Sequence, residues 1–437
     1  METELNKLNL SDKDTDTVNT KNCSYCNKAF TEELWCRRCD PFKKMGGWTS
    51  GNPDIDKFIK DTMHEAQYDP VARRNEFLGW VPFDRLADIK EIGEGGFSKV
   101  YSATWLDGYS YYVNSHEKRQ PVPIQVALKR LNGSQIMSDN YLNELKIHWG
   151  ISISYGLKFY AMTKDPETNE FMMIMQFANK GSLRSILTNN FNNILWNNKL
   201  KLLRDSANDL YKLHRSGYFH KDFHSGNILR VTDELSFVSD FGLSRPANEQ
   251  NPDNKIYGVM PYIAPEVLNG ESYTFSSDIY SFGVIMAELS SGKPPFYNKK
   301  HDISLTLAVC NGLRPEFGKG TPEFYKKLAY KCMSANPNER PSANELFNIF
   351  KFWLISIVEY RYKEEEFGYN AKEIKEAFEK ADEEIPNIST SYEKNSNAIY
   401  TGRKFSKPVN SSITTNSGKS DQDCDSQMVE LEVPNSI

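Results

Sequence analysis

Three polar side chains in the middle of the chain have a spacing that suits one kind of chemistry. Asp222 and Asn227 lie five positions apart in a loop after an amphipathic helix, and Asp240 follows thirteen residues later. A hydroxyl nucleophile needs a positioned carboxylate that accepts its proton, and Mg²⁺ on a triphosphate prefers carboxylate and amide oxygens. The set therefore predicts phosphoryl transfer to a hydroxyl, with Asp222 as proton acceptor and with Asn227 and Asp240 as magnesium ligands.

Two other features could hold the phosphates. Gly93–Val100 is rich in glycine between two expected strands, and glycines let a backbone approach phosphate oxygens without a Cβ in the way. Such a segment is equally compatible with a structural turn. Lys129 lies on an apolar strand, and Glu144 lies fifteen positions on, in an expected helix. Because a buried lysine is costly unless it is paired, an ion pair aimed at phosphates is one interpretation; two ordinary surface charges are the other.

Taken together and in order, these motifs resemble those of the eukaryotic protein kinases. Gly93–Val100 corresponds to the glycine-rich loop, and Val126–Lys129 corresponds to the strand that carries the lysine. His220–Asn227 corresponds to the catalytic loop. The two short motifs after that loop are Asp240–Gly242 and Ala264–Glu266. Glu144 falls where the family has the glutamate that pairs with the strand lysine. Gly181–Leu183 and Ser281–Val284 look most like the tyrosine-kinase-like group.

The resemblance implies a role for each residue of the predicted site. It implies that catalysis depends on Lys129, Glu144, Asp222, His224, Asn227 and Asp240. It implies that the nucleotide is held by Gly93, Glu94, Gly95, Gly96, Phe97, Val100, Ala127, Lys129, Gln176, Ala178, Asn227 and Asp240. ATP and Mg²⁺ are the implied cofactors, with Asn227 and Asp240 on the metal. Asp278 resembles the aspartate that supports the catalytic loop, and Arg340 resembles the arginine that pairs with Glu266.

Four positions depart from the family pattern. Ser98 replaces the third glycine of the loop, and it would cost about 1–2 kcal/mol if the backbone there needed a positive φ. Lys221 replaces the arginine before the catalytic aspartate, which keeps the charge but not the bidentate geometry. His224 stands where serine/threonine kinases have a lysine, and Val259 stands where many have a threonine. These last two bear on the class of acceptor hydroxyl.

The motifs need a scaffold that brings strands, loops and helices together. Residues 89–175 contain five short runs rich in β-formers, interrupted by one helix that Ser138 or Asp139 can cap. After residue 180 helical periodicity dominates. The expected fold class is therefore α+β, a two-lobed protein kinase-like fold with a small β-rich N-lobe at 87–177 and a larger helical C-lobe at 178–360.

Composition divides the rest of the chain. The last fifty or so residues are rich in Ser, Asn, Thr and Lys, and such a composition cannot offset the entropy cost of ordering the backbone. The predicted segments are a disordered stretch at 1–20, a linker with a helix at 46–86, a helical extension at 361–386 and a disordered tail at 387–437.

Four of the seven cysteines fall within seventeen positions, at Cys23, Cys26, Cys36 and Cys39. Paired C-x2-C knuckles can hold a structural Zn²⁺ tetrahedrally, so residues 21–45 are predicted to form a short zinc-binding module. Four reduced free cysteines are the alternative. Nothing in this module supplies catalytic groups, and we expect it to dock to a partner that the sequence does not identify.

Charge and hydropathy exclude other classes of protein. The chain has 53 basic and 58 acidic residues and a formal net charge of −5, which gives no electrostatic case for binding nucleic acid. The apolar run Leu346–Val358 is too short to span a bilayer, so it predicts a buried helix and no membrane partner. Few cysteines and a polar N-terminus without a signal peptide predict an intracellular, cytoplasmic protein.

These features favour an ATP-dependent protein kinase that transfers the γ-phosphate to a serine or threonine hydroxyl of protein substrates, in intracellular signalling. Gly258–Glu266 resembles the serine/threonine pattern more than the tyrosine pattern. A pseudokinase scaffold that binds nucleotide or partners without turnover is the alternative, motivated by Ser98, Lys221 and His224. A small-molecule phosphotransferase shares the catalytic-loop pattern, but the complete segment from Asp240 to Glu266, which shapes a peptide groove in protein kinases, argues against it.

Overall fold

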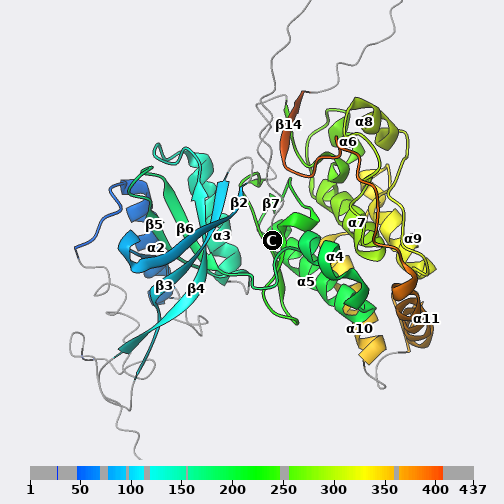
Figure 1. Cartoon of the computed structure of the whole chain (residues 1–437), viewed down its shortest axis with the longest axis horizontal. Coiled ribbons are helices and arrows are strands. Elements are labelled where there is room, and N and C mark those ends of the chain that lie inside the picture. Colours follow the sequence, from blue (N-terminus) through cyan, green and yellow to red (C-terminus); the bar gives the residue numbers. More distant parts are fainter. Residues whose placement is uncertain are drawn as a thin grey trace, which may run out of the picture.

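The protein has two lobes, one built around a β-sheet and one built from helices (Figure 1). The computed structural model describes residues 27, 47–68, 77–94, 98–112, 119–153, 156–246, 255–358 and 364–406. The predicted α+β fold class with a β-rich N-lobe and a helical C-lobe is confirmed. The predicted disordered stretch 1–20 and the four cysteines of the predicted zinc module lie outside the described residues.

A six-stranded sheet forms the N-lobe, in the order β1-β5-β6-β4-β3-β2. Its strands are β1 (Gly79–Trp80), β2 (Leu86–Glu94), β3 (Ser98–Tyr112), β4 (Arg119–Leu131), β5 (Phe159–Lys164) and β6 (Phe171–Gln176). Strands β2 to β6 are the five runs visible in the sequence, and they pair antiparallel. The sequence did not predict β1, which pairs in parallel with β5 at the edge of the sheet.

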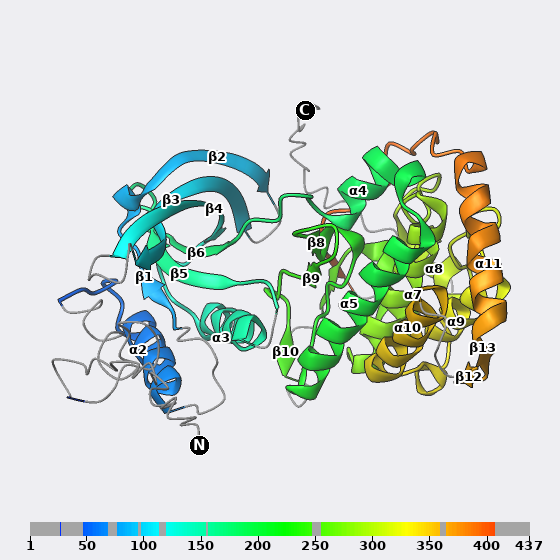
Figure 2. The ribbon, with the colours of Figure 1, turned by 90° about the horizontal axis from the view of Figure 1, so that it is seen from below.

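The helices are distributed unevenly between the lobes, with α2 and α3 on the sheet and the others in the C-lobe (Figures 1 and 2). Their bounds are α2 (Pro53–Tyr68), α3 (Asp139–Ile153), α4 (Leu183–Asn190), α5 (Trp196–Arg215), α6 (Pro265–Leu268), α7 (Phe275–Ser291), α8 (Ile303–Cys310), α9 (Glu323–Cys332), α10 (Ala343–Val358) and α11 (Ala371–Glu384).

Short elements connect these helices and carry much of the site. The strands are β7 (Tyr218–Phe219), β8 (Ile228–Arg230), β9 (Ser236–Val238), β10 (Arg245–Pro246), β11 (Lys255–Gly258), β12 (Glu365–Glu366), β13 (Tyr369–Asn370) and β14 (Arg403–Ser406). The 3₁₀ turns are η1 (Phe83–Arg85), η2 (Phe191–Asn193), η3 (Ser225–Asn227), η4 (Met260–Tyr262), η5 (Pro337–Glu339) and η6 (Ile385–Asn387).

The N-terminal helix α2 is part of the N-lobe core. Its residues Ile55 and Ile59 are fully buried, in the same apolar cluster as Leu145 and Trp149 of α3. The predicted linker with a helix at 46–86 contains this helix, but the helix is not a free connector, because its apolar face belongs to the cluster formed with α3 and the sheet. The structured N-lobe therefore begins well before residue 87.

The C-lobe core contains the apolar run that could have suggested a membrane segment. That run lies in α10, which packs along α5, and Leu346 and Trp353 within it are fully buried. The expected buried helix is therefore present. In the part of the chain that the structure describes, none of the helices has both the length and the apolar character needed to cross a bilayer.

The chain continues past the C-lobe core and then returns across it. Helix α11 lies within the predicted extension 361–386, and its Phe378 packs edge-to-face on Phe324 with ring centroids 5.3 Å apart. From α11 the chain runs back over the C-lobe to β14, which pairs antiparallel with β11 (Figure 1). The prediction of a disordered tail from residue 387 is therefore wrong for residues 387–406, because main-chain hydrogen bonds hold a segment with little apolar surface.

Candidate active site

A buried lysine joins the sheet, α3 and the loop after β9. Lys129 Nζ donates to Glu144 Oε1 at 2.5 Å and to Asp240 Oδ1 at 2.8 Å. The side chains of Lys129 and Glu144 are 9% and 7% exposed. Burial lowers the pKa of Lys129, but the carboxylates of Asp240 and Glu144 outweigh it and raise that pKa above its ordinary value. The strand-to-helix ion pair suggested by the sequence is present, and Asp240 completes it.

The carboxylate of Asp278 on α7 holds the backbone of the loop that contains Asp222. Asp278 accepts hydrogen bonds from the backbone N–H of His220 at 2.8 Å and of Lys221 at 3.1 Å. Arg340 donates two parallel hydrogen bonds to Glu266, each 2.7 Å long. These two buried contacts are the ones that the resemblance implied. They anchor the loop and the end of the segment that follows it to the rigid helical lobe.

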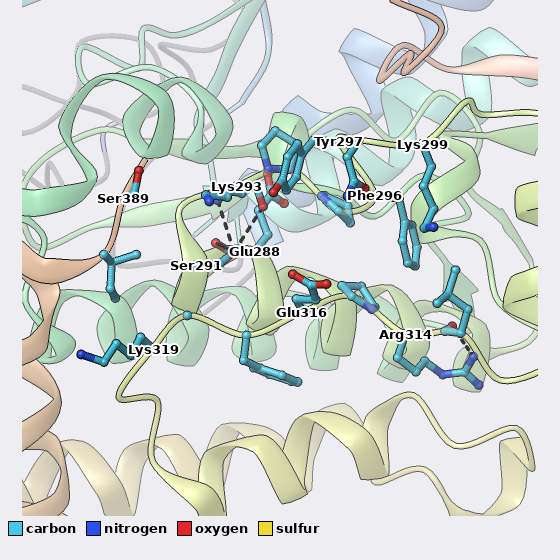
Figure 3. Close-up of a pocket in the computed structure, with 18 of the residues that line it drawn as sticks. Glu288, Ser291, Lys293, Phe296, Tyr297, Lys299, Arg314, Glu316, Lys319 and Ser389 are labelled. Atoms are coloured by element: carbon cyan, nitrogen blue, oxygen red, sulfur yellow. Dashed lines mark hydrogen bonds between the residues drawn. The ribbon is translucent and has the colours of Figure 1, made fainter. Parts of the chain in front are cut away.

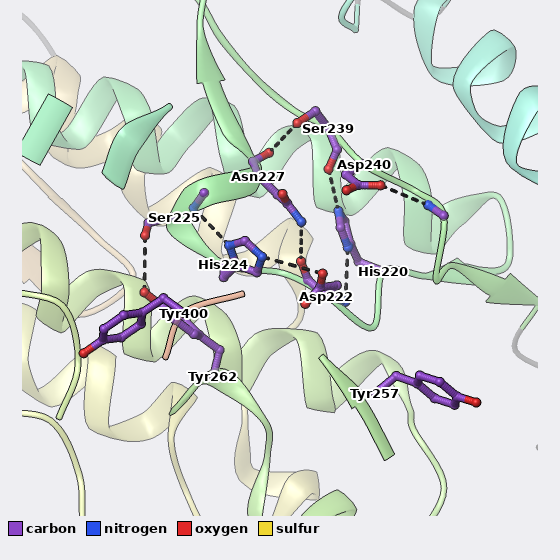
Figure 4. A network of polar contacts seen from close by, with 12 residues as sticks. His220, Asp222, His224, Ser225, Asn227, Ser239, Asp240, Tyr257, Tyr262 and Tyr400 are labelled. Carbon is purple, nitrogen blue, oxygen red and sulfur yellow. Dashed lines mark hydrogen bonds and ion pairs between the residues drawn. The ribbon is translucent and has the colours of Figure 1, made fainter. Parts of the chain in front are cut away.

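Asp222 and Asn227 lie side by side in this loop (Figure 4). Asn227 Nδ2 donates to the carbonyl oxygen of Asp222 at 2.9 Å, so the amide oxygen is the atom left to face a cation. Asp222 Oδ1 is buried and has no hydrogen-bond partner among the described residues. An unpaired buried carboxylate oxygen is costly, and a hydroxyl bound beside it would remove that cost.

The donor set here suits magnesium better than a metal held by protein alone. Burial opposes ionisation of Asp240, but Lys129 lowers the pKa of that carboxyl below its usual range. Its side chain is 43% exposed, so a carboxylate is presented at the surface of the site. The described residues contain no cluster of three or more His, Cys, Asp or Glu side chains fit for a metal. Because Mg²⁺ on nucleotides takes one or two protein oxygens plus phosphates, Asn227 and Asp240 fit this ion.

Two residues of the site have backbones in the left-handed region. Lys221 and Asp240 have φ values of 68° and 64°, a conformation that costs a non-glycine residue about 1–3 kcal/mol and that clusters at functional sites. The Lys221 ammonium lies 4.8 Å from the ring centroid of Tyr273 and 5.9 Å from that of Phe219. The lysine that replaces arginine therefore places its charge against aromatic rings of the C-lobe.

His224 lies next to the catalytic carboxylate. Its Nδ1 accepts the backbone N–H of Gly226 at 3.0 Å, so a neutral ring carries its proton on Nε2. That nitrogen is 3.6 Å from Asp222 Oδ2. The ring packs against Tyr262, with centroids 5.7 Å apart. His224 therefore lies beside Asp222 without a hydrogen bond to it, and a direct contact with phosphate stays a prediction.

The predicted glycine-rich loop is only partly within the described residues. Gly95, Gly96 and Phe97 lie outside them. Gly93 and Glu94 end β2, where Glu94 pairs with Lys99 of β3 at 3.2 Å. Ser98 begins β3 and does not have a positive φ. The strain considered for a serine at this position therefore does not arise.

Apolar residues from both lobes meet beside the lysine. Ala127 of β4, Ala178 after β6 and Leu229 of β8 are half-buried and pack on the same apolar cluster. Apolar surfaces from two sides suit a flat base. The sequence did not predict Leu229, although its place directly after the catalytic loop was a usable signal. Gln176 Oε1 is 3.4 Å from the Lys158 N–H, so the nucleotide role of Gln176 stays a prediction.

The phenylalanine after Asp240 connects α3 to the catalytic loop. Phe241 is 2% exposed, and its ring centroid is 4.7 Å from that of His148 and 5.3 Å from that of His220. His148 lies one helical turn after Glu144. Burial, reinforced by Lys129, lowers the pKa of His148 well below its ordinary value. A neutral imidazole thus fills the space between Glu144 and Phe241 and keeps the lysine cluster assembled.

A buried polar network that the sequence did not predict extends from the catalytic loop into the C-lobe. Glu288 of α7 accepts hydrogen bonds from Tyr262 Oη at 2.6 Å and from Ser225 Oγ at 2.8 Å. Arg184 Nη2 donates to Tyr262 Oη at 3.3 Å. Burial raises the pKa of Glu288, against the effect of Arg184. A signal was available: Glu288 is a charged residue near the end of the largely apolar helix α7, and buried charges need partners.

A cavity of about 360 Å³ lies elsewhere in the C-lobe (Figure 3). Lys293, Tyr297, Arg314 and Glu316 line one part of it, and Ser389 from the C-terminal segment lines another. None of its lining residues belongs to the predicted nucleotide-binding or catalytic sets. Glu288 also lines the cavity, so the cavity touches both the C-terminal segment and the buried network that reaches the loop of Asp222.

A known protein family matches the part of the chain that forms most of the two lobes. The family model described as protein tyrosine and serine/threonine kinase matches residues 86–350. The match covers more than half of the chain, and the chain therefore belongs to the protein kinase family. Membership of the tyrosine-kinase-like group stays a prediction.

Curated relatives include kinases of both hydroxyl classes. A probable serine/threonine-protein kinase of Dictyostelium discoideum is 30% identical over 280 residues, which cover 61% of this chain and 15% of the relative. The probable serine/threonine-protein kinase drkB of the same organism is 28% identical over 60% of this chain and 36% of the relative. Human tyrosine-protein kinase TXK is 28% identical over 60% of this chain and 47% of the relative. The chain thus matches less than half the length of each.

Proposed function

We propose that this member of the protein kinase family is catalytically active and transfers the γ-phosphoryl group of ATP to a serine or threonine hydroxyl of a protein. One observation carries the proposal: the buried Lys129 and Glu144 form a single ion cluster with the partly exposed Asp240. A strand lysine held between two carboxylates is preorganised for phosphates, and preorganised charge is the main source of catalysis in phosphoryl transfer.

Each residue has its own task in this proposal. Lys129, oriented by Glu144, binds the α- and β-phosphates. Asn227 and Asp240 hold Mg²⁺, which when bound neutralises charge on the phosphates. Asp222 orients the acceptor hydroxyl and takes its proton. The fixed loop beneath Asp222 supplies the alignment on which such a reaction depends.

The class of hydroxyl and the setting of the reaction are supported less directly. The named serine/threonine kinases among the relatives and the Gly258–Glu266 pattern support a serine or threonine acceptor. Protein substrates, a role in signalling and a cytoplasmic location stay predictions from the sequence. A nucleotide-binding scaffold without turnover is the second candidate. His224 favours it, because one of its two ring nitrogens already accepts the Gly226 N–H, which leaves fewer donors for phosphate than the ammonium of a lysine has.

Replacement of the proposed base tests the proposal. Asp222→Asn keeps the size of the side chain, so we expect Mg-ATP binding to stay nearly unchanged while turnover of labelled ATP falls about 10²–10⁴-fold. Phosphoamino-acid analysis of the labelled protein then reports the hydroxyl class, and phosphotyrosine alone would reject a serine/threonine kinase. Mg-ATP binding without any labelling would favour the scaffold if it were found both in the wild-type chain and in Tyr400→Ala.

A further inference from the structure

The last described part of the chain lies directly beside the catalytic loop. Main-chain hydrogen bonds fix its path: Asn395 N–H donates to the carbonyl of Tyr297 at 2.9 Å, and His301 N–H donates to the carbonyl of Asn397 at 3.1 Å. Ala398 is 1% exposed. These contacts hold residues 395–398, which include a turn at 396–397, against the C-lobe surface that leads to Asp222.

Tyr400 is the largest anchor of this segment (Figure 4). Its hydroxyl donates to the carbonyl of Pro295 at 2.9 Å, and its own carbonyl accepts from Arg184 Nη1 at 2.9 Å. The ring lies 5.2 Å from the Arg184 guanidinium and 4.9 Å from the His301 ring centroid. Arg184 also belongs to the buried network of Tyr262 and Glu288, so the anchor is tied to the catalytic loop itself.

Beyond Tyr400 the segment passes the catalytic aspartate and then pairs with the segment that precedes η4. Arg403–Ser406 forms β14, which pairs antiparallel with β11, and Arg403 is opposite Gly258. Gly402 lies just before this strand. A Cβ built on Gly402 would be 3.5 Å from Asp222 Oδ2, and within the described residues no other heavy atom outside its two chain neighbours lies within 4 Å. The backbone of residue 402 therefore faces the carboxylate that takes the acceptor proton.

We propose that residues 388–406 occupy the acceptor-peptide groove of this kinase as a pseudosubstrate, with Gly402 in the place of the residue that receives the phosphoryl group. The inference rests on the proposed kinase activity, and it adds the occupant, the register and the class of peptide that the groove accepts. Glycine has no hydroxyl, so the segment can bind in this register without being phosphorylated there.

The same register assigns the acceptor class. A serine side chain at position 402 would place its hydroxyl one bond beyond a Cβ that is 3.5 Å from Asp222 Oδ2, within reach of a hydrogen bond. A tyrosine would place its hydroxyl on the far side of a ring, and the backbone lies too close for that. The groove therefore accepts an extended peptide with a short hydroxyl side chain at the acceptor position and an aromatic residue two positions before it.

Thr401 does not serve as the acceptor in this arrangement. Its side chain is exposed, whereas a Cβ on residue 402 would point toward Asp222 Oδ2.

A single substitution should turn the occupant into a substrate. In Gly402→Ser the new hydroxyl oxygen attacks the γ-phosphorus of ATP, the bond from that phosphorus to the β,γ-bridging oxygen breaks, ADP leaves, and Asp222 takes the hydroxyl proton. We expect one phosphate at position 402, located by mass spectrometry, with a rate constant that does not change with protein concentration. Gly402→Ala is the matched control, because it adds the same Cβ without the hydroxyl.

The labelling experiment has outcomes that oppose the inference. Labelling of other positions but not of 402 in Gly402→Ser, or a rate that rises in proportion to protein concentration, would contradict the proposed register in cis. Gly402→Ser combined with Asp222→Asn should lose the label. A label that survives this change would also contradict the register, because the phosphoryl group would then come from another enzyme.

A binding experiment tests occupancy without any turnover. The probe is a fluorescent peptide with the sequence of residues 396–406 and serine at the position of Gly402. In the full chain, Tyr400→Ala should bind it at least about tenfold more tightly than wild type, because the groove is then free for a larger fraction of the time. Tyr400→Phe keeps the ring and loses only the Pro295 hydrogen bond, so its affinity should fall between the two. Ser396→Ala, at an exposed position of the same segment, should match wild type.

The two experiments separate failure of the inference from failure of the proposed function. Equal peptide affinity in wild type, Tyr400→Phe and Tyr400→Ala would overturn the inference, even if all three phosphorylate the peptide. Tighter binding by Tyr400→Ala with no phosphate transfer by any variant would support the occupied groove and reject an active kinase. Tighter binding together with faster phosphorylation of the peptide supports both.

Discussion

The two segments that flank the kinase lobes, residues 47–81 and 387–406, attach to the molecule by different physical means. The N-terminal segment is held by apolar burial, with Ile55 and Ile59 fully buried against α3. The C-terminal segment is held by main-chain hydrogen bonds and a half-buried Tyr400. Apolar burial contributes about 1.5–3 kcal/mol per large side chain, whereas a hydrogen bond exchanged with water contributes about 0.5–1.5.

This difference suggests different roles: the N-terminal segment is a support, which stabilises the fold, and the C-terminal segment is a cover, which lies over the site. The N-terminal segment packs behind α3 and so stabilises the helix that carries Glu144. The C-terminal segment lies in front of Asp222 and contributes only Ile388 to the buried members of the C-lobe core cluster, with Tyr400 packed against its edge. One extension is therefore expected to be needed for folding and catalysis, and the other to limit catalysis. The predictions below test that contrast, beginning with the largest effect.

The largest effect should come from a cavity in α2. Ile59→Ala should lower the free energy of unfolding by about 2–5 kcal/mol, and phosphoryl transfer should fall because α3 loses its backing and Lys129 loses a fixed Glu144. Denaturant unfolding and ATP turnover measure the two effects. Glu65→Ala, at an exposed position of α2, should change stability by no more than about 0.5 kcal/mol. If Ile59→Ala and Glu65→Ala lower the free energy of unfolding equally, the apolar face of α2 does not stabilise the fold.

The next effect concerns α3, the helix that α2 supports. The folded pKa of His148 is well below its ordinary value, so below about pH 6.5 the unfolded chain binds a proton that the folded chain does not. Stability should therefore fall as pH drops from about 6.5, by up to about 1.4 kcal/mol per unit from this one group. His148 faces Glu144, Lys129, Asp240 and His220, and the pKa of His220 is also lowered, mainly by burial.

Substitution of the histidine isolates its share. His148→Leu fills a similar volume without a titrating group, and its stability should depend less on pH between about 6.5 and 5 than that of wild type. Urea midpoints at matched pH values measure this. Identical slopes for the two proteins would show that His148 does not titrate on unfolding in this range.

A smaller effect is expected in the C-terminal segment. Tyr392 stacks obliquely on Tyr297 with ring centroids 4.7 Å apart, a pair worth about 0.5–1.5 kcal/mol. Tyr392→Ala should lower the free energy of unfolding by about that amount and should not lower activity. Glu393→Ala at the neighbouring exposed position is the control. A stability loss as large as that of Ile59→Ala would remove the distinction between support and cover.

The smallest effect on the lobes should come from removing zinc. If Cys23, Cys26, Cys36 and Cys39 hold a structural ion, purified protein carries about one zinc per chain, and Cys23→Ser with Cys26→Ser releases it. Unfolding of the kinase lobes should change by less than about 0.5 kcal/mol, as for substitutions remote from the core. Metal analysis that finds no zinc in protein prepared without chelators would leave the four cysteines as free thiols.

The sequence predicted most of the chemical site because its residues are named by local motifs. Asp222, Asn227 and Asp240 lie within nineteen positions of each other, and the chemistry of phosphates restricts what can stand there. The helix α2 could also be recognised. Its packing on α3 could not, since an apolar face does not identify the surface that covers it.

The C-terminal contacts had no comparable signal. Arg184 and Tyr400 are hydrogen-bonded across 216 positions, and neither lies in a motif. The prediction of disorder weighed apolar side chains against chain entropy, but backbone N–H and C=O groups carry much of the attachment here. Because every residue has these groups, amino-acid composition does not indicate where they form hydrogen bonds with another segment.

The strand pair between β14 and β11 has a kinetic consequence. Both strands belong to one chain, so an incoming peptide competes with the covalently attached C-terminal segment. For a short flexible connection, the effective concentration of such a segment is of millimolar order. Dilution of the protein cannot relieve such competition, and a substrate that meets the enzyme only by free diffusion is at a disadvantage. A substrate that also binds the kinase at a second point has a higher local concentration. Such a substrate would displace the C-terminal segment more readily than a freely diffusing one.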